Sequence, residues 1–401
     1  MCRQVKFGVK MKNLIITLTI LSIVFFTSCN KKNNNIPLVK WTAQLPDTSK
    51  TGLGFELLQN MHTIVLYDAK PEMGTYSHHP HITYYDEVIY TMWSNHKVDE
   101  DAPGQRVLMK LSTDQGETWE DLVELFPPLD HVDGADKDGK GRRTQCANGF
   151  AIVENILYAF SEVWDDGGDA RHAGQGRLFR SIHTDGTLGD IFWLRKEPAR
   201  LIAGITVIPL GNPELVDKIN AFLQLPENEL TWDFRYRTTD IKAKDGHQLC
   251  EPTPAWQLKN GTWVKIYRDI GKPVSHFNYA SFSVDNGKEW SVPTKTDMID
   301  GCARANAGTL PDGQVYIISN IDPDGARDPL AISLSKDGLS FDRVALIRNN
   351  TPEMRFEGRW KCEGFQYPHS LVLGDDLWVI YSVGKEDVQL TRIPIKEVIN
   401  L

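Results

Sequence analysis

The sequence lacks the motifs of several common enzyme classes. Its six cysteines show no CxxC spacing, which argues against a cysteine zinc module. Nothing in it indicates an HExxH helix, a phosphate-binding loop or a Ser–His–Asp hydrolase. Helical periodicity is also missing from the body of the chain, and no long low-complexity run interrupts it. What remains is a large chain whose hydrophobic content, 41%, is typical of a folded globular protein.

An excess of positive charge is absent as well. The chain has 44 basic and 53 acidic residues and a formal net charge of −9. Such a surface is poor at non-specific binding of nucleic acid, so we expect no nucleic-acid partner. If the substrate is anionic, its site must supply local arginine, lysine or histidine.

The N-terminus has the pattern of a targeting segment. From Met11 it reads MKNLIITLTILSIVFFTSC, a lysine followed by an apolar run and small residues that end at Cys29. The run is short for a membrane span, and FTSC resembles a bacterial lipobox. We therefore predict a lipoprotein signal peptide over 1–29 with lipidation of Cys29, and a polar tether over 30–39. This implies an exported lipoprotein, periplasmic or on the cell surface, anchored to the outer membrane.

Four cysteines mark a repeat between 40 and 401. Each opens a hairpin-like segment: CANGFAIVENILYAFS, CEPTPAWQLKNGTWVKIY, CARANAGTLPDGQVYIIS and CEGFQYPHSLVLGDDLWVIYS. The stretch HHPHITYYDEVIYTMWS fits the same template. A hairpin that recurs at this spacing predicts an all-β fold, a single monomeric β-propeller domain. We count six copies, starting near 78, 146, 199, 250, 302 and 362, and the strand MHTIVLYD is expected to close the last blade.

A second repeat supports the propeller. STDQGETW (112–119) and SVDNGKEW (283–290) share the pattern S-x-D-x-G-x-x-W, and SKDGLSF (335–341) is a shorter relative. These segments resemble Asp-boxes, a turn signature of sialidase-type propellers. Aspartate and glycine suit a tight turn, so the boxes are expected to be structural rather than catalytic.

Histidines concentrate in the stretch TYSHHPHITYYDEVIYTMWSNHKVDEDAPGQRV (residues 75–107). A two-residue turn at Asp86-Glu87 would pair His79 with Ser94. Cross-strand neighbours lie about 5 Å apart and diagonal ones about 7–8 Å. His79 and His96 are therefore predicted to meet at the mouth of the central channel as acid/base groups. His81, on the same strand face as His79, could pack there or bind an ion.

Other polar residues are expected around this mouth. Those at the equivalent strand starts are Asn148, Glu251, Arg304, Asn306, Glu363 and His369. Three chemistries fit them. Two carboxylates would make a glycosidase, histidines with a carboxylate a zinc hydrolase, and histidine, tyrosine and arginine a lyase for uronic acids by β-elimination. The lyase requires no cofactor for its chemistry, although a structural calcium or zinc ion is an option.

Several segments resemble a family of sialidase-like propeller enzymes, among them ulvan lyases and enzymes that cleave rhamnose–glucuronate linkages. The matching segments include TYSHHPHITYY, MWSNHKVDEDAPGQRV and YPHSLVLGDDLWVIYSVGKEDVQLTRIPI. The resemblance implies seven blades rather than six. It also implies a polysaccharide lyase that acts on an anionic substrate such as ulvan, with an α-L-rhamnosidase as the alternative.

The resemblance assigns roles to particular residues. His79 and His96 would be the family's histidine pair, with Tyr236 or Tyr279 as the tyrosine. Arg235 or Arg304 would neutralise the uronate carboxylate. In the rhamnosidase branch, the single catalytic histidine would be His62, provided that it faces the ring.

Two further functions are weaker alternatives. Sialidases begin with an Arg-Ile-Pro motif that feeds an arginine triad, whereas the Arg-Ile-Pro of this chain is at 392–394, near its end. A non-catalytic glycan-binding lipoprotein would present aromatic side chains without an acid/base pair, and the convergence of His79 and His96 argues against it.

Overall fold

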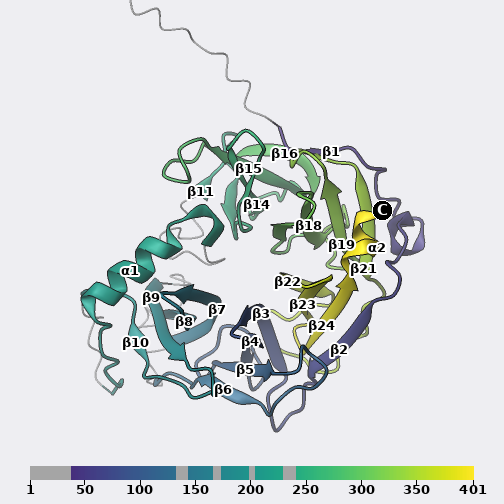
Figure 1. Cartoon of the computed structure of the whole chain (residues 1–401). Helices are drawn as coiled ribbons and strands as arrows, with labels where there is room; N and C mark the ends of the chain where they lie inside the picture. The colour runs from purple at the N-terminus through teal and green to yellow at the C-terminus, as the bar shows by residue number, and fades with distance from the viewer. Residues whose placement is uncertain (1–37, 132–142, 166–172, 198–203, 229–240) are drawn as a thin grey trace, which may run out of the picture. The chain divides into compact units, whose positions relative to one another are not determined.

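Antiparallel strands pair into five separate sheets that surround a common centre (Figure 1). The computed structural model describes residues 38–131, 143–165, 173–197, 204–228 and 241–401. Each sheet is one blade, and in Figure 1 the strands β3, β7 and β22 lie nearest the centre of their blades. The described residues therefore form an all-β propeller of five blades. The predicted signal peptide, Cys29 and residues 30–37 of the tether lie outside the described residues.

The strands follow one another through the blades in chain order. Blade 1 contains β3 (Tyr76–Tyr85), β4 (Val88–His96), β5 (Arg106–Ser112) and β6 (Val123–Phe126). Blade 2 contains β7 (Arg143–Val153), β8 (Ile156–Asp165), β9 (Ala173–Ile182) and β10 (Phe192–Trp193). Blade 3 contains β11 (Ile241–Lys242), β12 (Gln248–Cys250), β13 (Trp256–Gln257), β14 (Trp263–Asp269), β15 (Phe277–Ser283) and β16 (Thr294–Ile299).

The last two blades complete the ring. Blade 4 contains β17 (Asn306–Thr309), β18 (Val315–Asn320), β19 (Leu330–Ser335) and β21 (Arg343–Arg348). Blade 5 contains β22 (Phe365–Leu373), β23 (Asp376–Val383), β24 (Asp387–Pro394) and, outermost, β2 (His62–Tyr67). The predicted closure by MHTIVLYD is confirmed, because β2 pairs antiparallel with β24. Short elements complete the inventory: β1 (Lys40–Trp41), β20 (Ser340–Phe341), η1 (Thr51–Gly54), η2 (Pro226–Asn228) and α2 (Ile395–Ile399).

The prediction of six or seven blades was wrong. The copy expected near 199 begins in residues 198–203, which lie outside the described residues, and the described part of the interval after it holds α1 (Pro213–Leu223). The side chain of Asn212 caps the N-terminus of this helix. The apolar helix residues Val216 and Ile219 lie one turn apart and pack on blade 2. The apolar content of the interval therefore belongs partly to a helix. None of the helices in the described residues is long and apolar enough to span a membrane.

Tight turns fix the register of the inner hairpins. At the predicted turn Asp86-Glu87, both residues have positive φ, 48° and 63°. Glu154-Asn155 repeats this conformation between β7 and β8, with φ of 50° and 59°. Two consecutive positive φ angles define a type I′ turn, whose twist matches that of antiparallel strands. These turns lie at the end of each blade away from the mouth.

The Asp-boxes are structural, as predicted. In the first box, Asp114 Oδ1 accepts hydrogen bonds from Ser112 Oγ (2.8 Å) and Thr118 N (2.9 Å). These hydrogen bonds lower the pKa of Asp114 to about 2. The box glycine, Gly116, has φ of 86°, and a Cβ there would lie 2.5 Å from the Trp378 ring of blade 5. The boxes thus fasten turns and pack blade against blade.

Every blade bends as its inner segment approaches the mouth. One residue in each segment has positive φ: His79, Gly149, Glu251, Cys302 and Tyr367. In β3, β7 and β22 the same place carries a β-bulge in which the inner strand has one extra residue. Side chains that alternation would send into the sheets are re-aimed by these bends, so they gather around the axis.

Candidate active site

Tyr367 lies at the centre of the polar side chains around the mouth of the central channel. It lies in the β22 bulge and is only 5% exposed. Its hydroxyl donates to Glu251 Oε1 (2.5 Å) and accepts from Arg268 Nη1 (3.0 Å). Arg268 also pairs with Glu251 Oε2 at 3.1 Å. Because Glu251 and Arg268 belong to blade 3 and Tyr367 to blade 5, these hydrogen bonds cross the ring.

Two more arginines lie over the ring of Tyr367. The guanidinium of Arg304 is 5.4 Å from the ring centroid and that of Arg327 is 5.6 Å away. Arg327 donates to Gln366 Oε1 and to a backbone carbonyl. Arg304 is 1% exposed, and its Nη2 donates to Pro368 O at 3.3 Å, whereas its Nε and Nη1 have no hydrogen-bond partner among the described residues. Burial lowers the pKa of Arg304 to about 10. It is a buried cation with N–H groups available to a ligand.

His78 and His79 complete this group, which we call the central cluster: His78, His79, Glu251, Arg268, Arg304, Arg327 and Tyr367. The ring centroid of His78 is 4.1 Å from that of Tyr367, and the ring centroid of His79 is 5.4 Å away. A serine hydroxyl holds each Nδ1: Ser382 for His78 (2.7 Å) and Ser94 for His79 (3.2 Å). Both rings are thus fixed in orientation.

The environment separates the protonation states of these groups. Burial lowers the pKa of His79 well below 6.5, and the charge of Arg304 adds to that shift. Burial also raises the pKa of Tyr367 well above 10, and the Glu251 carboxylate adds to that shift. At neutral pH, His79 is a neutral imidazole able to accept a proton, and Tyr367 is a phenol able to donate one. Two titratable groups whose pKa values are driven apart are the usual sign of an acid and a base.

The predicted strand register was wrong at the mouth. Ser94 lies opposite His78 instead of His79, and His96 lies opposite Tyr76. The cause is the bulge at His79, whose φ is 55° and which adds one residue to β3. The alternation of side chains in the sequence does not reveal an added residue. Because of that residue, each strand pairing nearer the mouth is shifted by one position.

His96 has partners of its own, away from His79. Its Nδ1 accepts backbone hydrogen bonds from Asp99 (2.8 Å) and Val98 (3.3 Å). It therefore caps the turn that follows β4, and that turn carries Glu100 towards the central cluster. The geometry gives His96 a positioning role, and the histidine that faces His79 is His78.

Other predicted residues form the wall around the cluster. Asn148 is buried and donates to Glu162 Oε2 at 3.3 Å. Asn306 is buried and accepts from Ser370 Oγ at 2.5 Å. Glu363 is exposed, two residues before β22, so it lies on the outer rim.

His81 and His369 lie deeper in the channel, beside each other. Their ring centroids are 4.9 Å apart, and Ile82 N donates to His369 Nδ1 at 3.4 Å. Burial lowers the pKa of His369 to about 3, and it lowers that of His81 well below 6.5. Two neutral rings packed together indicate a structural role at this depth.

Several candidates lie elsewhere. Tyr236 and Arg235 are outside the described residues, so their roles stay predictions. His62 is exposed on the outermost strand of blade 5, opposite Arg392. Arg392 belongs to the Arg-Ile-Pro segment and pairs with Asp376 at 2.6 Å, far along the blade from the mouth. Neither His62 nor this segment faces the ring.

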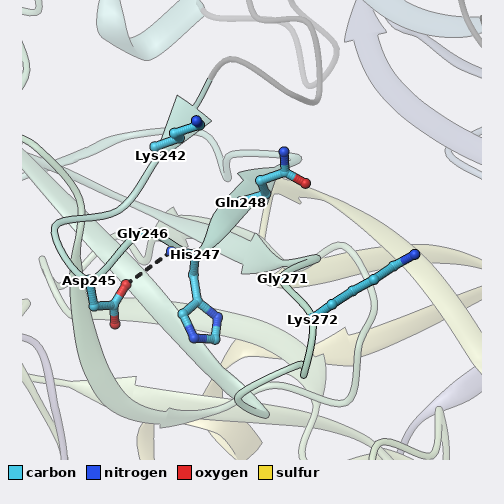
Figure 2. Close-up of a pocket in the computed structure, with 7 residues that line it drawn as sticks. All are labelled: Lys242, Asp245, Gly246, His247, Gln248, Gly271 and Lys272. Atoms are coloured by element: carbon cyan, nitrogen blue, oxygen red, sulfur yellow. Dashed lines mark hydrogen bonds between the residues drawn. The ribbon is translucent and has the colours of Figure 1, made fainter.

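Tyr279 lies beside the central cluster rather than in it. It is fully buried on β15, and its hydroxyl donates to Asp245 Oδ2 at 2.9 Å. The ring of His247 stacks on it with centroids 5.7 Å apart. Asp245 and His247 line a separate pocket on blade 3, which Figure 2 shows.

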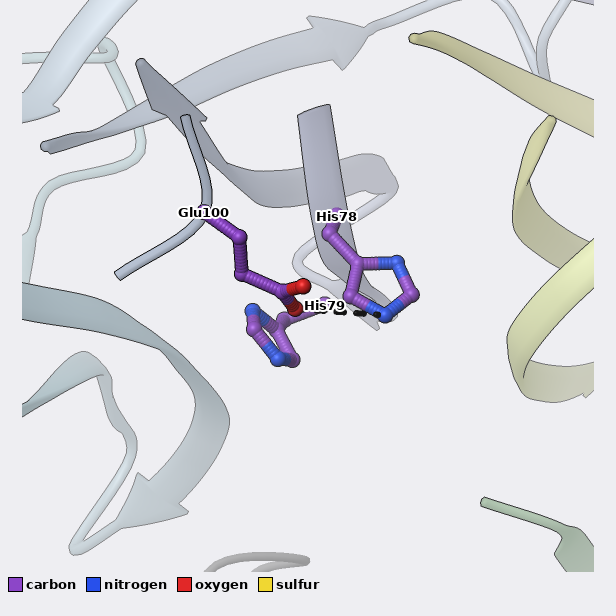
Figure 3. Close-up of side chains that lie close together, drawn as sticks. All are labelled: His78, His79 and Glu100. Carbon is purple, nitrogen blue, oxygen red and sulfur yellow. Dashed lines mark ion pairs between the residues drawn. The ribbon is translucent and has the colours of Figure 1, made fainter. Parts of the chain in front are cut away.

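Three side chains could be considered for a metal ion: His78, His79 and Glu100 (Figure 3). Their ligand atoms lie within 4.8 Å of one another, and His78 Nε2 is buried with no hydrogen-bond partner. However, Lys385 Nζ already donates to Glu100 Oε2, and Lys385 and Arg304 both act to lower the pKa of His78. A dication would stand among these cations, so the residues fit a metal ion poorly. His81 is not one of the three, and the structural ion stays a prediction.

The strongest members of the cluster were missed from the sequence. Tyr367, Arg327 and Arg268 received no catalytic or binding role, although a signal was present. The triplets His79-Pro80-His81 and Tyr367-Pro368-His369 share the pattern x-Pro-His at equivalent bulges. Aligning the two hairpins on their prolines would have placed Tyr367 opposite His79.

Comparison with known proteins supports the fold. Residues 193–379 match a family model described as a BNR repeat-like domain, and residues 66–209 match one described as an N-terminal beta propeller. Each match covers less than half of the chain. No curated protein matches the sequence.

Solved structures agree with the family models. A sialidase is 26% identical with a TM-score of 0.72, over 89% of this chain and 35% of its own. A protein of unknown function from Dyadobacter fermentans is 12% identical with a TM-score of 0.52, over 84% of this chain and 100% of its own. A Trypanosoma rangeli sialidase is 11% identical with a TM-score of 0.50, over 86% of this chain and 61% of its own.

The fold is a sialidase-like β-propeller with BNR-type repeats. The chain spans about a third of the length of the sialidase that it matches at 26% identity.

Proposed function

We propose that this protein is a polysaccharide lyase that cleaves rhamnose–uronic acid linkages of an anionic polysaccharide such as ulvan. The observation that carries the proposal is Arg304, a buried cation beside Tyr367 whose Nε and Nη1 have no hydrogen-bond partner in the described part of the chain. A uronate carboxylate is a planar anion, and a guanidinium fork binds such a group with two hydrogen bonds. Burial of a charge without full hydrogen bonding is costly unless a ligand completes it.

The chemistry follows from the protonation states. Neutral His79 removes the C5 proton of the uronate, and the electrons of that C–H bond form the C4–C5 double bond. The C4–O bond breaks, and Tyr367 gives its proton to the leaving oxygen. Arg304 and Arg327 stabilise the negative charge that develops on the carboxylate in the transition state.

Glu251 and Arg268 are positioning residues in this reaction. Their hydrogen bonds come from blade 3, across the propeller from blade 5, and hold the phenol oxygen of Tyr367 in place. A tyrosine held at two points loses little rotational freedom when the substrate binds, so more of the binding energy is available for the transition state. Loss of either partner should lower turnover without removing the proton that Tyr367 donates.

The short Tyr367–Glu251 hydrogen bond favours a second candidate, a glycoside hydrolase. Sialidases are known to use a tyrosine nucleophile. Here Glu251 would take the phenol proton while Tyr367 attacks the anomeric carbon, the glycosidic C–O bond breaks, and the leaving oxygen takes a proton from solvent. Water would then attack the same carbon, the Tyr367–sugar bond would break, and the second proton of that water would return to the Tyr367 oxygen. The α-L-rhamnosidase alternative loses the residue on which it depended, because His62 lies on the outermost strand and faces solvent.

Export and anchoring form a separate proposal. Cys29 would carry the lipid and tether a monomer to the outer membrane, in the periplasm or on the cell surface, with the polysaccharide as its partner. Labelling with a radioactive fatty acid, in the full chain and in Cys29→Ala, tests this. Label that persists in the variant contradicts it.

One incubation separates the candidate activities. The full chain is mixed with ulvan and, separately, with rhamnose–glucuronate oligosaccharides, and ultraviolet absorbance is followed together with released sugar. Absorbance of an unsaturated uronate identifies the lyase. Free sugar without that absorbance identifies the hydrolase. Binding without any product would leave a glycan-binding module and contradict both.

A further inference from the structure

The pocket on blade 3 is a second polar hollow, beside the central cluster. It has a volume of about 410 Å³ and lies between the ends of β11 and β12 and the turn after β14 (Figure 2). Its lining includes Lys242, His247, Gln248, Gly271 and Lys272. The lining is almost entirely polar or charged, so an apolar ligand would gain little there.

The floor of this pocket is rigid. Asp269 Oδ2 lies 3.0 Å from His247 Nδ1 and accepts from Ser275 N at 2.6 Å, and its Oδ1 accepts from Gly271 N at 2.7 Å. Asp269 is 1% exposed, and these three donors satisfy both oxygens of its carboxylate. The His247 ring also stacks on Tyr279. Asp269 and Tyr279 therefore hold the His247 ring in place.

Two lysines on the walls have no counter-ion. Among the residues that the structure describes, neither Lys242 nor Lys272 forms an ion pair with a carboxylate, and both side chains are exposed. In Figure 2, the amide of Gln248 lies between them. Asp245 also lines the pocket, but its Oδ2 accepts from the Tyr279 hydroxyl and its Oδ1 from His247 N. In a chain of net charge −9, this is a local concentration of available positive charge.

The pocket is connected to the central cluster by one short strand. His247 precedes Glu251 by four residues, and β12 between them pairs with the end of β14 that carries Arg268. At about 3.3 Å per residue, the two sites are separated by roughly 13 Å. A polysaccharide held at Arg304 would therefore reach this pocket with a sugar that is not being cleaved.

We propose that Lys242 and Lys272 form a subsite for an oxyanion carried by that neighbouring sugar, a sulfate ester or a second carboxylate. This inference rests on the proposed function for the position of the chain, whereas binding of the anion does not depend on cleavage. Lysine supplies a mobile point charge and three donors, which suits a sulfate or carboxylate at a solvent-exposed site. In Figure 2 the His247 ring points away from the ends of both lysines, so it belongs to the floor of the pocket and not to the subsite.

Charge-removing variants test the subsite. Lys242→Gln, Lys272→Gln and the double variant keep side-chain length and lose charge, and Lys259→Gln removes the same charge from an exposed turn at the other end of blade 3. Binding of the full chain to ulvan is measured by titration calorimetry, with desulfated ulvan and carboxyl-reduced ulvan as further ligands. Exposed ion pairs contribute about 0.2–1 kcal/mol, so we expect an affinity loss of about two- to fivefold per lysine, and none for Lys259→Gln.

The ligand series identifies the anion. If the loss disappears with desulfated ulvan, the pocket binds a sulfate ester, and if it disappears with carboxyl-reduced ulvan, the pocket binds a carboxylate. The proposal is overturned if the lysine variants lose as much affinity for both modified ligands as for ulvan, or if Lys259→Gln loses as much affinity for ulvan as they do. Cleavage assayed in parallel keeps the two questions apart. Reduced binding in a chain that cleaves nothing contradicts the lyase alone, and unchanged binding in an active chain contradicts the subsite alone.

Discussion

Replacing Arg304 with methionine should lower the activity of the protein and raise its stability. Methionine keeps much of the side-chain length and removes the charge. A carboxylate of the substrate bound by the guanidinium fork of Arg304 would accept two charge-assisted hydrogen bonds, worth about 1.5–3 kcal/mol apiece. Their loss should lower kcat/KM by about two to four orders of magnitude. Arg304→Lys keeps the charge without the planar fork, so its kcat/KM should lie between those of the wild type and Arg304→Met.

The same substitution should stabilise the fold. The pKa of Arg304 is lowered from 12.5 to about 10, so the folded state disfavours the charged form. At neutral pH, below both pKa values, the group is charged in the folded and unfolded states, and the folded state bears the whole cost. At about 1.4 kcal/mol per pKa unit this cost is about 3 kcal/mol. Methionine removes it and leaves an apolar side chain in a buried place.

The assay is a urea titration of each variant, next to the kinetics on ulvan. Arg327→Met is the matched control, because Arg327 already donates to Gln366 and to the carbonyl of Cys302. That variant should lose stability by about 1–3 kcal/mol, since buried acceptors are left unsatisfied. If Arg304→Met is both less stable than the wild type and fully active, the interpretation of Arg304 as a carboxylate-binding cation is refuted.

Three other predictions follow from the geometry. Tyr367→Phe keeps the ring that packs on His78 but removes the proton donor, so turnover should fall by about 10²–10⁴-fold with circular dichroism unchanged. His79→Gln should abolish elimination; in the wild type the acid limb of the rate profile should lie below pH 6.5, because the base protonates only at its lowered pKa. An acid limb at or above 6.5 would exclude His79. Gly116→Ala should cost about 1–3 kcal/mol, because a Cβ there would lie 2.5 Å from Trp378. Its melting temperature should drop while activity at low temperature persists, and an unchanged melting temperature would contradict this packing.

The propeller could be predicted from the sequence because its signals are local. The turn at Asp86-Glu87 and the Asp-box around Asp114 each depend on residues within a short window. The closing strand His62–Tyr67 pairs with β24 near the other end of the chain, and it was expected from its place before the first repeat. The number of blades depends on what fills the long interval after Cys146, where a hairpin was expected near 199 and the helix Pro213–Leu223 was not.

The site was harder to predict because it depends on small backbone shifts. A single added residue at His79 shifted the pairing of the strands near the mouth, so that His96 lies opposite Tyr76 and Ser94 lies opposite His78. The hydrogen bond from Tyr367 to Glu251 joins residues 116 positions apart, and no spacing in the sequence predicts such a contact. Glu251 and Arg304 were placed at the mouth because they begin equivalent strands, which is a property of the repeat.

The hydrogen bonds that cross the ring have an evolutionary consequence. With five blades, side chains of blades 3 and 5, which are not neighbours, meet at Tyr367. Substitutions at Glu251, Arg304 and His79 therefore act through one shared partner, and their effects should be strongly epistatic. Such a centre can change only through coordinated substitutions in several repeats. Duplication or loss of one blade would pull these contacts apart, so a propeller of this kind has little freedom to vary its number of blades.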